Sequence, residues 1–267
     1  MILDFHTHQF PDVLAPRAMA VLTENCSGAG LKPTTDGTCA GAERILQAAG
    51  VGGAVVCNIA TSARQQKNVN RFAMETKRLH PFFFPLGSLH PEGDAPEEVL
   101  DDLRQAGIGG IKIHPDYVGI EIDDARFDRI FALCEQRGFF VVTHAGLDPV
   151  SPNHIHATPE KIRTVLRRYP RMKLIAAHLG GLRMAKEVRD MLVGEDIWFD
   201  TSLSAQRQDE KELLLSILKE HRPDRLLFGS DTPWSDPAAE VTFLRDAVRD
   251  EELRDRIFCR NAQELLK

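Results

Sequence analysis

Short, continuously apolar segments recur along the chain, and most of them end in polar residues. Few of these segments alternate between apolar and polar positions, as a half-exposed strand does. Parallel strands that are covered on both faces are apolar throughout, so the pattern predicts a buried parallel sheet. We expect eight strands, at Ile2–Phe5, Gly53–Asn58, Phe83–Ser88, Gly110–His114, Phe139–His144, Lys173–His178, Ile197–Thr201 and Arg225–Ser230.

Segments with apolar residues at helical spacing separate these strands. Gly107, Gly138 and Gly194 fall where such a helix would end. The clearest helical segments are residues 64–79 and 95–106, and the same style recurs in 124–137, 159–169, 209–221 and 236–248.

The alternation of strands and helices predicts the fold class. Eight strand–helix repeats with short, right-handed connections favour closure into a (β/α)8 TIM barrel, an α/β fold of typically about 250 residues. The chain has 267 residues, so we expect a single domain over residues 1–267. A doubly wound open sheet is the alternative, but no Gly-rich phosphate-binding turn follows the first strand.

The stretch from about Gln9 to Gly41 is long for a connection between a strand and a helix. It contains Cys26 and two runs with glycine, SGAG and TTDGTCAG. Long connections are often lids over a site. A lid and an irregular insertion are both open interpretations of this stretch.

Composition and charge exclude some classes of protein. The 33 Lys and Arg against 39 Asp and Glu give a net charge of −6, which argues against a nucleic-acid-binding surface. No apolar run approaches the roughly 20 residues of a membrane helix, and the N-terminus does not resemble a signal peptide. The five cysteines match no zinc-finger spacing and indicate reduced thiols. We expect a cytoplasmic protein that acts on a small molecule, with a homo-oligomer left open.

Polar residues at the ends of several predicted strands point to a metal site. The first strand is followed by His6 and His8, and alternation places positions i and i+2 on the same side. Later strands end in His144, His178 and Asp231. The C-terminal ends of barrel strands converge on one face. Four histidines and an aspartate at this level indicate a bound divalent metal.

With these residues the sequence resembles the amidohydrolase superfamily, and within it the amidohydrolase-related (amidohydrolase 2) family of aminocarboxymuconate-semialdehyde decarboxylase-like proteins. The resemblance covers the whole chain. It rests on DFHTH at 4–8, GSLHP at 87–91, GIKIHPD at 110–116, THAG at 143–146, AAHLGG at 176–181, FDTS at 199–202 and LLFGSDTPW at 226–234.

The resemblance implies a divalent metal, usually zinc, held by His6, His8, His144 and Asp231. It also implies that His178 is a catalytic acid/base or a group that orients the substrate. The physical chemistry agrees, because zinc lowers the pKa of bound water from 15.7 towards about 7. Asp231 can accept a proton from that water, and a histidine such as His178 changes its charge near neutral pH.

Lys112 has three open interpretations. In binuclear members of the superfamily a carbamylated lysine on the fourth strand bridges two metals, so a second ion held through Lys112 is one of them. The second is a positive charge that binds a substrate carboxylate, and the third is a structural pair inside the barrel.

Further candidates stand near other strand ends. Asp200 and Thr201 end the seventh predicted strand, where a buried hydrogen bond and a functional role are equally open. A second HxH pair, His154 and His156, lies in a loop that is placed to cover the metal, or else is simply solvated. The candidates for binding substrate are Lys112, His114, Asn58, His90, Arg183 and Trp234.

The expected function is hydrolysis of a C–N or C–O bond in a small molecule by metal-activated water. The alternative is non-oxidative decarboxylation of an unsaturated or aromatic acid at the same site. A deoxyribonuclease of the TatD type is disfavoured, because Lys112 stands where a glutamate is expected. A non-catalytic binding protein is disfavoured because the set of metal ligands is complete.

Overall fold

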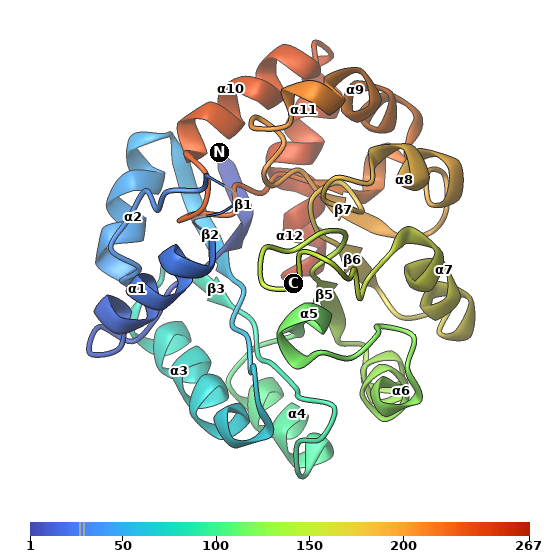
Figure 1. Cartoon of the computed structure of the whole chain (residues 1–267). Helices are drawn as coiled ribbons and strands as arrows, with labels where there is room; N and C mark the ends of the chain where they lie inside the picture. Colours follow the sequence, from blue (N-terminus) through green and yellow to red (C-terminus); the bar gives the residue numbers. More distant parts are fainter. Residues whose placement is uncertain (27, 29) are drawn as a thin grey trace.

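The computed structural model describes residues 1–26, 28 and 30–267. Eight parallel strands form a ring that is surrounded by helices (Figure 1). The strands overlap all eight segments that the sequence predicts. They are β1 (Ile2–Thr7), β2 (Val51–Val56), β3 (Phe83–Pro85), β4 (Gly110–Ile113), β5 (Phe140–Thr143), β6 (Leu174–Ala176), β7 (Trp198–Asp200) and β8 (Leu226–Leu227).

Backbone hydrogen bonds close the ring. Three strands pair in the order β1-β2-β3 and five in the order β4-β5-β6-β7-β8. Lys112 N donates to Gly87 O at 2.8 Å, which joins the end of β3 to β4. Phe5 N donates to Phe228 O at 2.7 Å, which joins β1 to the end of β8. The (β/α)8 barrel is therefore confirmed, and the open-sheet alternative does not apply.

All six predicted helical segments contain a helix. The helices are α1 (Ala15–Cys26), α2 (Cys39–Ala48), α3 (Gln66–Leu79), α4 (Pro96–Gln105), α5 (Pro115–Val118), α6 (Asp128–Arg137), α7 (Pro159–Arg168), α8 (Ala185–Met191), α9 (Lys211–Glu220), α10 (Pro237–Ala247), α11 (Glu251–Asp255) and α12 (Asn261–Leu265). Among the described residues, none of them has the length and apolar character needed to cross a membrane.

Of the two open interpretations of the stretch from Gln9 to Gly41, the irregular insertion does not hold over part of its length, and the lid stays a prediction. This stretch contains α1 and the start of α2. Only Ala15, Met19 and Cys26 of α1 are buried, so its apolar face is narrow and its periodicity is weak. Ser27 and Ala29, which belong to the SGAG run, lie outside the described residues.

The core has an inner and an outer layer. The outer layer fills the space between strands and helices. The inner layer includes Leu3, Phe5 and Phe140 inside the barrel, and Ala262 and Leu265 of α12 pack against the same cluster. Figure 1 shows α12 and the C-terminus near the axis of the ring. The barrel is thus a packed core, and α12 covers one of its ends.

The pairing of β1 with β2 has a register shift between Asp4 and Thr7. Leu3 and Phe5 belong to the inner core. After the shift, His6 and His8 are the residues whose side chains turn inward. Such irregularities commonly re-aim side chains beside functional sites.

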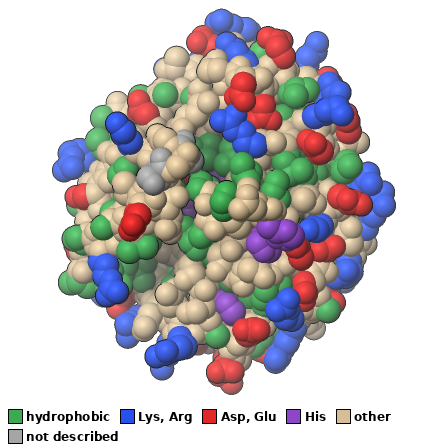
Figure 2. Space-filling model, viewed as in Figure 1, with side chains coloured by type: hydrophobic (Ala, Val, Ile, Leu, Met, Phe, Trp, Pro, Cys, Tyr) green, Lys and Arg blue, Asp and Glu red, His purple; other side chains and the backbone are tan. Residues whose placement is uncertain are grey.

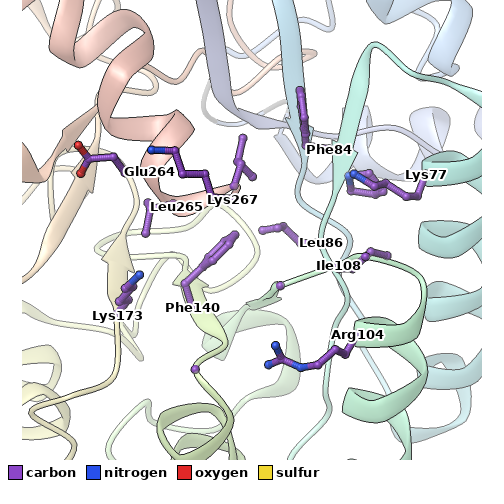
Figure 3. A pocket seen from close by; sticks show the side chains of 15 residues that line it. Lys77, Phe84, Leu86, Arg104, Ile108, Phe140, Lys173, Glu264, Leu265 and Lys267 are labelled. Atoms are coloured by element: carbon purple, nitrogen blue, oxygen red, sulfur yellow. The ribbon is translucent and has the colours of Figure 1, made fainter.

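A cavity of about 440 Å³ lies at the N-terminal ends of the strands (Figure 3). Phe84, Phe140 and Leu265 line it, together with basic side chains such as Lys173. None of the metal or substrate-binding candidates borders this cavity. It therefore does not mark the site that the strand-end residues form.

Candidate metal centre

His6, His8 and Asp231 converge where β1 and β8 end. His8 Nε2 lies 3.1 Å from Asp231 Oδ1, and His6 Nε2 lies 3.3 Å from the same oxygen. His6 and Asp231 are buried, and His8 is partly buried. Two imidazole nitrogens and one carboxylate oxygen therefore face a common point.

The other ring nitrogen of His6 and of His8, Nδ1, is held by a hydrogen bond. His6 Nδ1 is 2.9 Å from Asp200 Oδ2, and His8 Nδ1 is 3.1 Å from the carbonyl oxygen of Cys57. Both partners accept hydrogen bonds, so Nδ1 carries the proton in each neutral ring. The Nε2 lone pairs then point at the Asp231 oxygen, and a cation is needed to make that arrangement favourable.

The spacing of these atoms fits a divalent ion. Ligands about 2.1 Å from a tetrahedral zinc are about 3.4 Å from one another. The separations of 3.1 and 3.3 Å are close to this value. Anchoring of a ligand histidine through its other nitrogen is also typical of metal sites. The residues present therefore fit a resident metal ion.

Lys112 on β4 reaches the same point. Its side chain is buried, and its Nζ lies 3.1 Å from His6 Nε2. Burial, and then the charge of Lys112, holds the pKa of His6 well below its usual range, so the ring is neutral at pH 7. The Nε2 lone pair can accept from Lys112 or bind a metal, but it cannot do both. A metal ligated by His6 requires this contact to open.

A chain of hydrogen bonds connects Asp200 to His144. Ser202 Oγ donates to Asp200 Oδ1, so it accepts from His178 Nδ1, which is 2.7 Å away. His178 Nε2 then accepts from His144 Nδ1, at 3.1 Å. Burial is the largest cause that keeps the pKa of His178 well below its usual range. The chain fixes the proton positions of both rings.

His144 lies beside the converging trio rather than within it. Its Nε2 is buried and has no hydrogen-bond partner among the described residues. That atom is 3.7 Å from Asp148 Oδ2, and the ring stacks on His114 with centroids 4.4 Å apart. The hydrogen-bond chain leaves a lone pair on Nε2. His144 can therefore serve as a ligand, and that role stays a prediction.

Two of the candidate catalytic residues have unusual backbone conformations. His178 has φ 59° and Asp231 has φ 71°, a left-handed region that residues other than glycine seldom adopt. Strained positions of this kind cluster at functional sites. Arg207, which is fully buried, donates to His178 O at 2.9 Å and to Gly181 O at 3.0 Å. It holds the turn after β6 in place.

The remaining predicted residues are more scattered. Asn58 Nδ2 donates to Leu86 O at 2.9 Å, which ties the ends of β2 and β3. His90 Nδ1 accepts from Glu92 N in a turn. Arg183 is exposed and pairs with Asp209 at 2.6 Å. Trp234 is partly buried, and its backbone N donates to Asp231 O. Of the substrate-binding candidates, Lys112 and His114 touch the central histidines.

Sequence reasoning missed three residues that shape the site. Ser202 and Asp148 follow a strand-end residue by two and four positions, and Ser202 also closes the FDTS motif at 199–202. Arg207 comes from a distant loop and had no signal at all. Asp200, which the sequence left open between two roles, anchors His6 and accepts from the backbone N of His178 at 3.2 Å.

Solved structures of other proteins are similar to this chain over nearly its whole length. The chain resembles an uncharacterised TIM-barrel protein from Bordetella bronchiseptica, with TM-score 0.76, 17% identity, and coverage of 99% of this chain and 98% of that one. It also resembles 5-carboxyvanillate decarboxylase from Sphingomonas paucimobilis, with TM-score 0.69, 15% identity, and coverage of 99% and 98%. A probable 2-pyrone-4,6-dicarboxylic acid hydrolase from Acinetobacter baumannii gives TM-score 0.68, 15% identity, and coverage of 99% and 98%.

These three likenesses show the fold. Among curated proteins, none matches the sequence. The sequence model of the family described as amidohydrolase matches residues 4–267, which is nearly the whole chain. The chain therefore belongs to the amidohydrolase family, within the amidohydrolase superfamily of enzymes.

Proposed function

We propose that this enzyme hydrolyses a C–N or C–O bond in a small molecule that carries a carboxylate. One observation carries the choice of hydrolysis. Asp231 directs Oδ1 at both His6 and His8, and its Oδ2 has no hydrogen-bond partner among the described residues. A carboxylate with one engaged and one free oxygen can help hold a metal and accept a proton.

We further propose that His6, His8 and Asp231 hold one zinc ion, with His144 as an additional ligand. A zinc ion held there supplies Lewis acidity and lowers the pKa of water. Zinc is favoured because imidazole and carboxylate ligands suit it.

The protein groups around this point have separate roles. Asp231 Oδ2 accepts the proton of the attacking water. Once its contact with His144 Nδ1 opens, His178 Nε2 passes that proton on to the leaving group, while Ser202 and Asp200 hold its Nδ1 side. Lys112 supplies a buried positive charge that attracts the substrate carboxylate once its contact with His6 opens.

Decarboxylation is the second candidate. The buried charge of Lys112 supports it, because a carboxylate held beside a cation is positioned for loss as carbon dioxide. Solved structures similar to this chain carry names of both kinds: a carboxyvanillate decarboxylase and a probable pyrone-dicarboxylic acid hydrolase. Lys112 thus serves either reaction, whereas the free Asp231 oxygen favours hydrolysis.

A paired assay distinguishes the two reactions. The chelator-stripped protein is reloaded with Zn²⁺ or Mn²⁺ and supplied with small carboxylated esters, amides and lactones, and with aromatic carboxylic acids. We expect hydrolysis products without release of carbon dioxide, and loss of this activity in Asp231→Asn. Carbon dioxide released from the acids, with no hydrolysis of the other compounds, would assign the site to decarboxylation.

A further inference from the structure

A second cluster of side chains that can bind a metal lies outside the candidate centre. It consists of Glu121, in the segment after α5, and of His154 and His156, in the loop between β5 and α7. One ligand atom from each lies within 4.8 Å of the other two. Ile122 N donates to His156 O at 3.0 Å, which holds the two segments together. Figure 2 shows histidine beside acidic side chains on the surface of this face.

Glu121 and His154 form the outer half of this cluster. His154 Nε2 forms a hydrogen bond with Glu121 Oε1, and the rings of His154 and His156 are 4.5 Å apart. Lys161 Nζ contacts the other carboxylate oxygen, Oε2, at 2.6 Å. The His154 side chain is 58% exposed. An ion from solvent can therefore reach Oε1 and His154 while Lys161 stays on Oε2.

His156 forms the inner, anchored half. Its Nδ1 lies 3.0 Å from Asp116 Oδ1, so Nδ1 carries the proton and Nε2 keeps its lone pair. The Asp116 carboxylate is fully buried, and its Oδ2 has no partner among the described residues. Ser151 Oγ donates to Oδ1 at 2.5 Å. A buried carboxylate behind a histidine is the usual support of a metal ligand.

We propose that Glu121, His154 and His156 form an outer binding site for a divalent transition-metal ion of the zinc type. Two imidazoles and one carboxylate suit Zn²⁺, Co²⁺, Ni²⁺ or Cu²⁺ better than Mg²⁺ or Ca²⁺, which prefer oxygen ligands. Water completes the coordination on the exposed side. The charge of Lys161 weakens the site, so its affinity is lower than that of a site without a neighbouring cation.

An ion bound there fixes the loop that approaches the candidate centre. The same loop carries Asp148, whose Oδ2 lies 3.4 Å from His114 Nε2. Asp116, which supports His156, follows His114 by two residues and also holds Ser151. Binding at the outer site therefore ties residues 148–156 to the segment after α5. Slower amide hydrogen exchange in this loop is expected when the ion binds.

Titration of the chelator-stripped protein with Zn²⁺ by calorimetry tests the outer site. Wild type is expected to bind one equivalent more than His154→Ala/His156→Ala. Glu121→Gln, which keeps the size of the side chain, should also lose that equivalent. Asp116→Asn keeps all three ligands, and its outer affinity should fall about 10–100-fold because His156 is held less firmly. His80→Ala is the matched control, since His80 is a partly exposed histidine at the end of α3.

A variant of the candidate centre separates this proposal from the proposed function. His6→Ala/His8→Ala should keep the outer equivalent whether or not the central one exists. The proposal is overturned if His154→Ala/His156→Ala binds as many equivalents as wild type with the same affinities. It is also overturned if the His6→Ala/His8→Ala variant binds no Zn²⁺.

Discussion

At the scale of single residues, both ring nitrogens of His178 belong to the hydrogen-bond chain, and neither is among the atoms that face the proposed metal. Its Nδ1 faces Ser202, and its Nε2 faces His144. His178→Asn should keep the metal and lose turnover by about 10²–10⁴-fold, the usual contribution of an acid–base group. Metal content and kcat on a substrate found in the paired assay check this. Loss of the metal in this variant would make His178 a ligand and favour a binuclear site.

Asp200 acts through His6, so it affects how firmly the metal is held. Its carboxylate fixes His6 Nδ1 at 2.9 Å, and supports of this kind typically change metal affinity about 10–100-fold. Asp200→Asn should weaken Zn²⁺ binding by that factor in competition with a chromogenic chelator. Asp196→Asn, at an exposed aspartate before β7, is the control and should bind normally. Equal affinities in the two variants would contradict this role.

Some of this site could be predicted from the sequence, and some could not. His6, His8 and Asp231 follow apolar strands, and the ends of strands meet at one face of a barrel. The sequence pattern and the fold together therefore predict that these three side chains lie close to one another. The pairing of Asp200 with His6 joins residues that are 194 positions apart. The His144 ring stacks on His114, and its Nε2 lies 3.7 Å from Asp148 Oδ2, so this grouping is set by side-chain orientation. Periodicity carries no information about either.

At the scale of elements, Gly146 joins the loops that follow β5 and β6. It has φ +85°, and an added Cβ would lie 2.2 Å from Leu182 N and 2.3 Å from Leu182 O. Gly194 has the same φ, but a Cβ there would have open space. The left-handed conformation costs about 1–2 kcal/mol, and overpacking adds about 1–3 kcal/mol.

Gly146→Ala should therefore lower the free energy of unfolding by roughly 2–5 kcal/mol, and Gly194→Ala by only about 1–2 kcal/mol. Urea unfolding of both variants measures the difference. An equal decrease in the free energy of unfolding of the two variants would mean that the loop after β6 moves to accommodate the added Cβ, and it would contradict the prediction.

Glu240 on α10 has a buried carboxyl group. It accepts from Ser235 Oγ and from Ala205 N, yet burial raises its pKa to about 8. The folded state thus binds this proton more tightly than the unfolded chain. The resulting stability is complete below about pH 4.5 and is lost as the pH rises towards 8.

Glu240→Gln should remove this loss of stability. Between pH 5 and 8 the free energy of unfolding of wild type should fall relative to the variant, by up to about 1.4 kcal/mol for each pH unit. Urea unfolding at pH 5.5 and 8 checks the prediction. A difference between the two proteins that stays constant with pH would contradict the raised pKa.

The elements with strong periodicity could be predicted, and the weak ones could not. The segment 64–79 and helix α3 agree closely, because buried positions recur every three or four residues along it, at Gln66, Asn70, Ala73 and Thr76. Helix α1 buries only three residues, so its sequence resembles an irregular connection. The α5 helix has four residues, too few for a periodic signal.

At the scale of the whole molecule, closure of the barrel brings together site residues that are far apart in the sequence. Eight apolar strands in parallel order predict a closed sheet, and closure brings β1 beside β8. That contact places His6 and His8 against Asp231, which is more than 220 residues away in the chain. The sequence predicts the ring and its active face. It does not predict that α12 packs against the inner core, because that helix has only five residues.

Anomalous diffraction at the zinc absorption edge, from crystals grown with Zn²⁺, tests the metal centre most directly. We predict a peak between β1 and β8, about 2.0–2.1 Å from the Nε2 atoms of His6 and His8 and about 2.0–2.2 Å from an oxygen of Asp231. Lys112 Nζ should then have left His6 Nε2. The absence of a peak within bonding distance of these three ligands, even with a peak at His154 and His156, would contradict a metal-dependent function for this site.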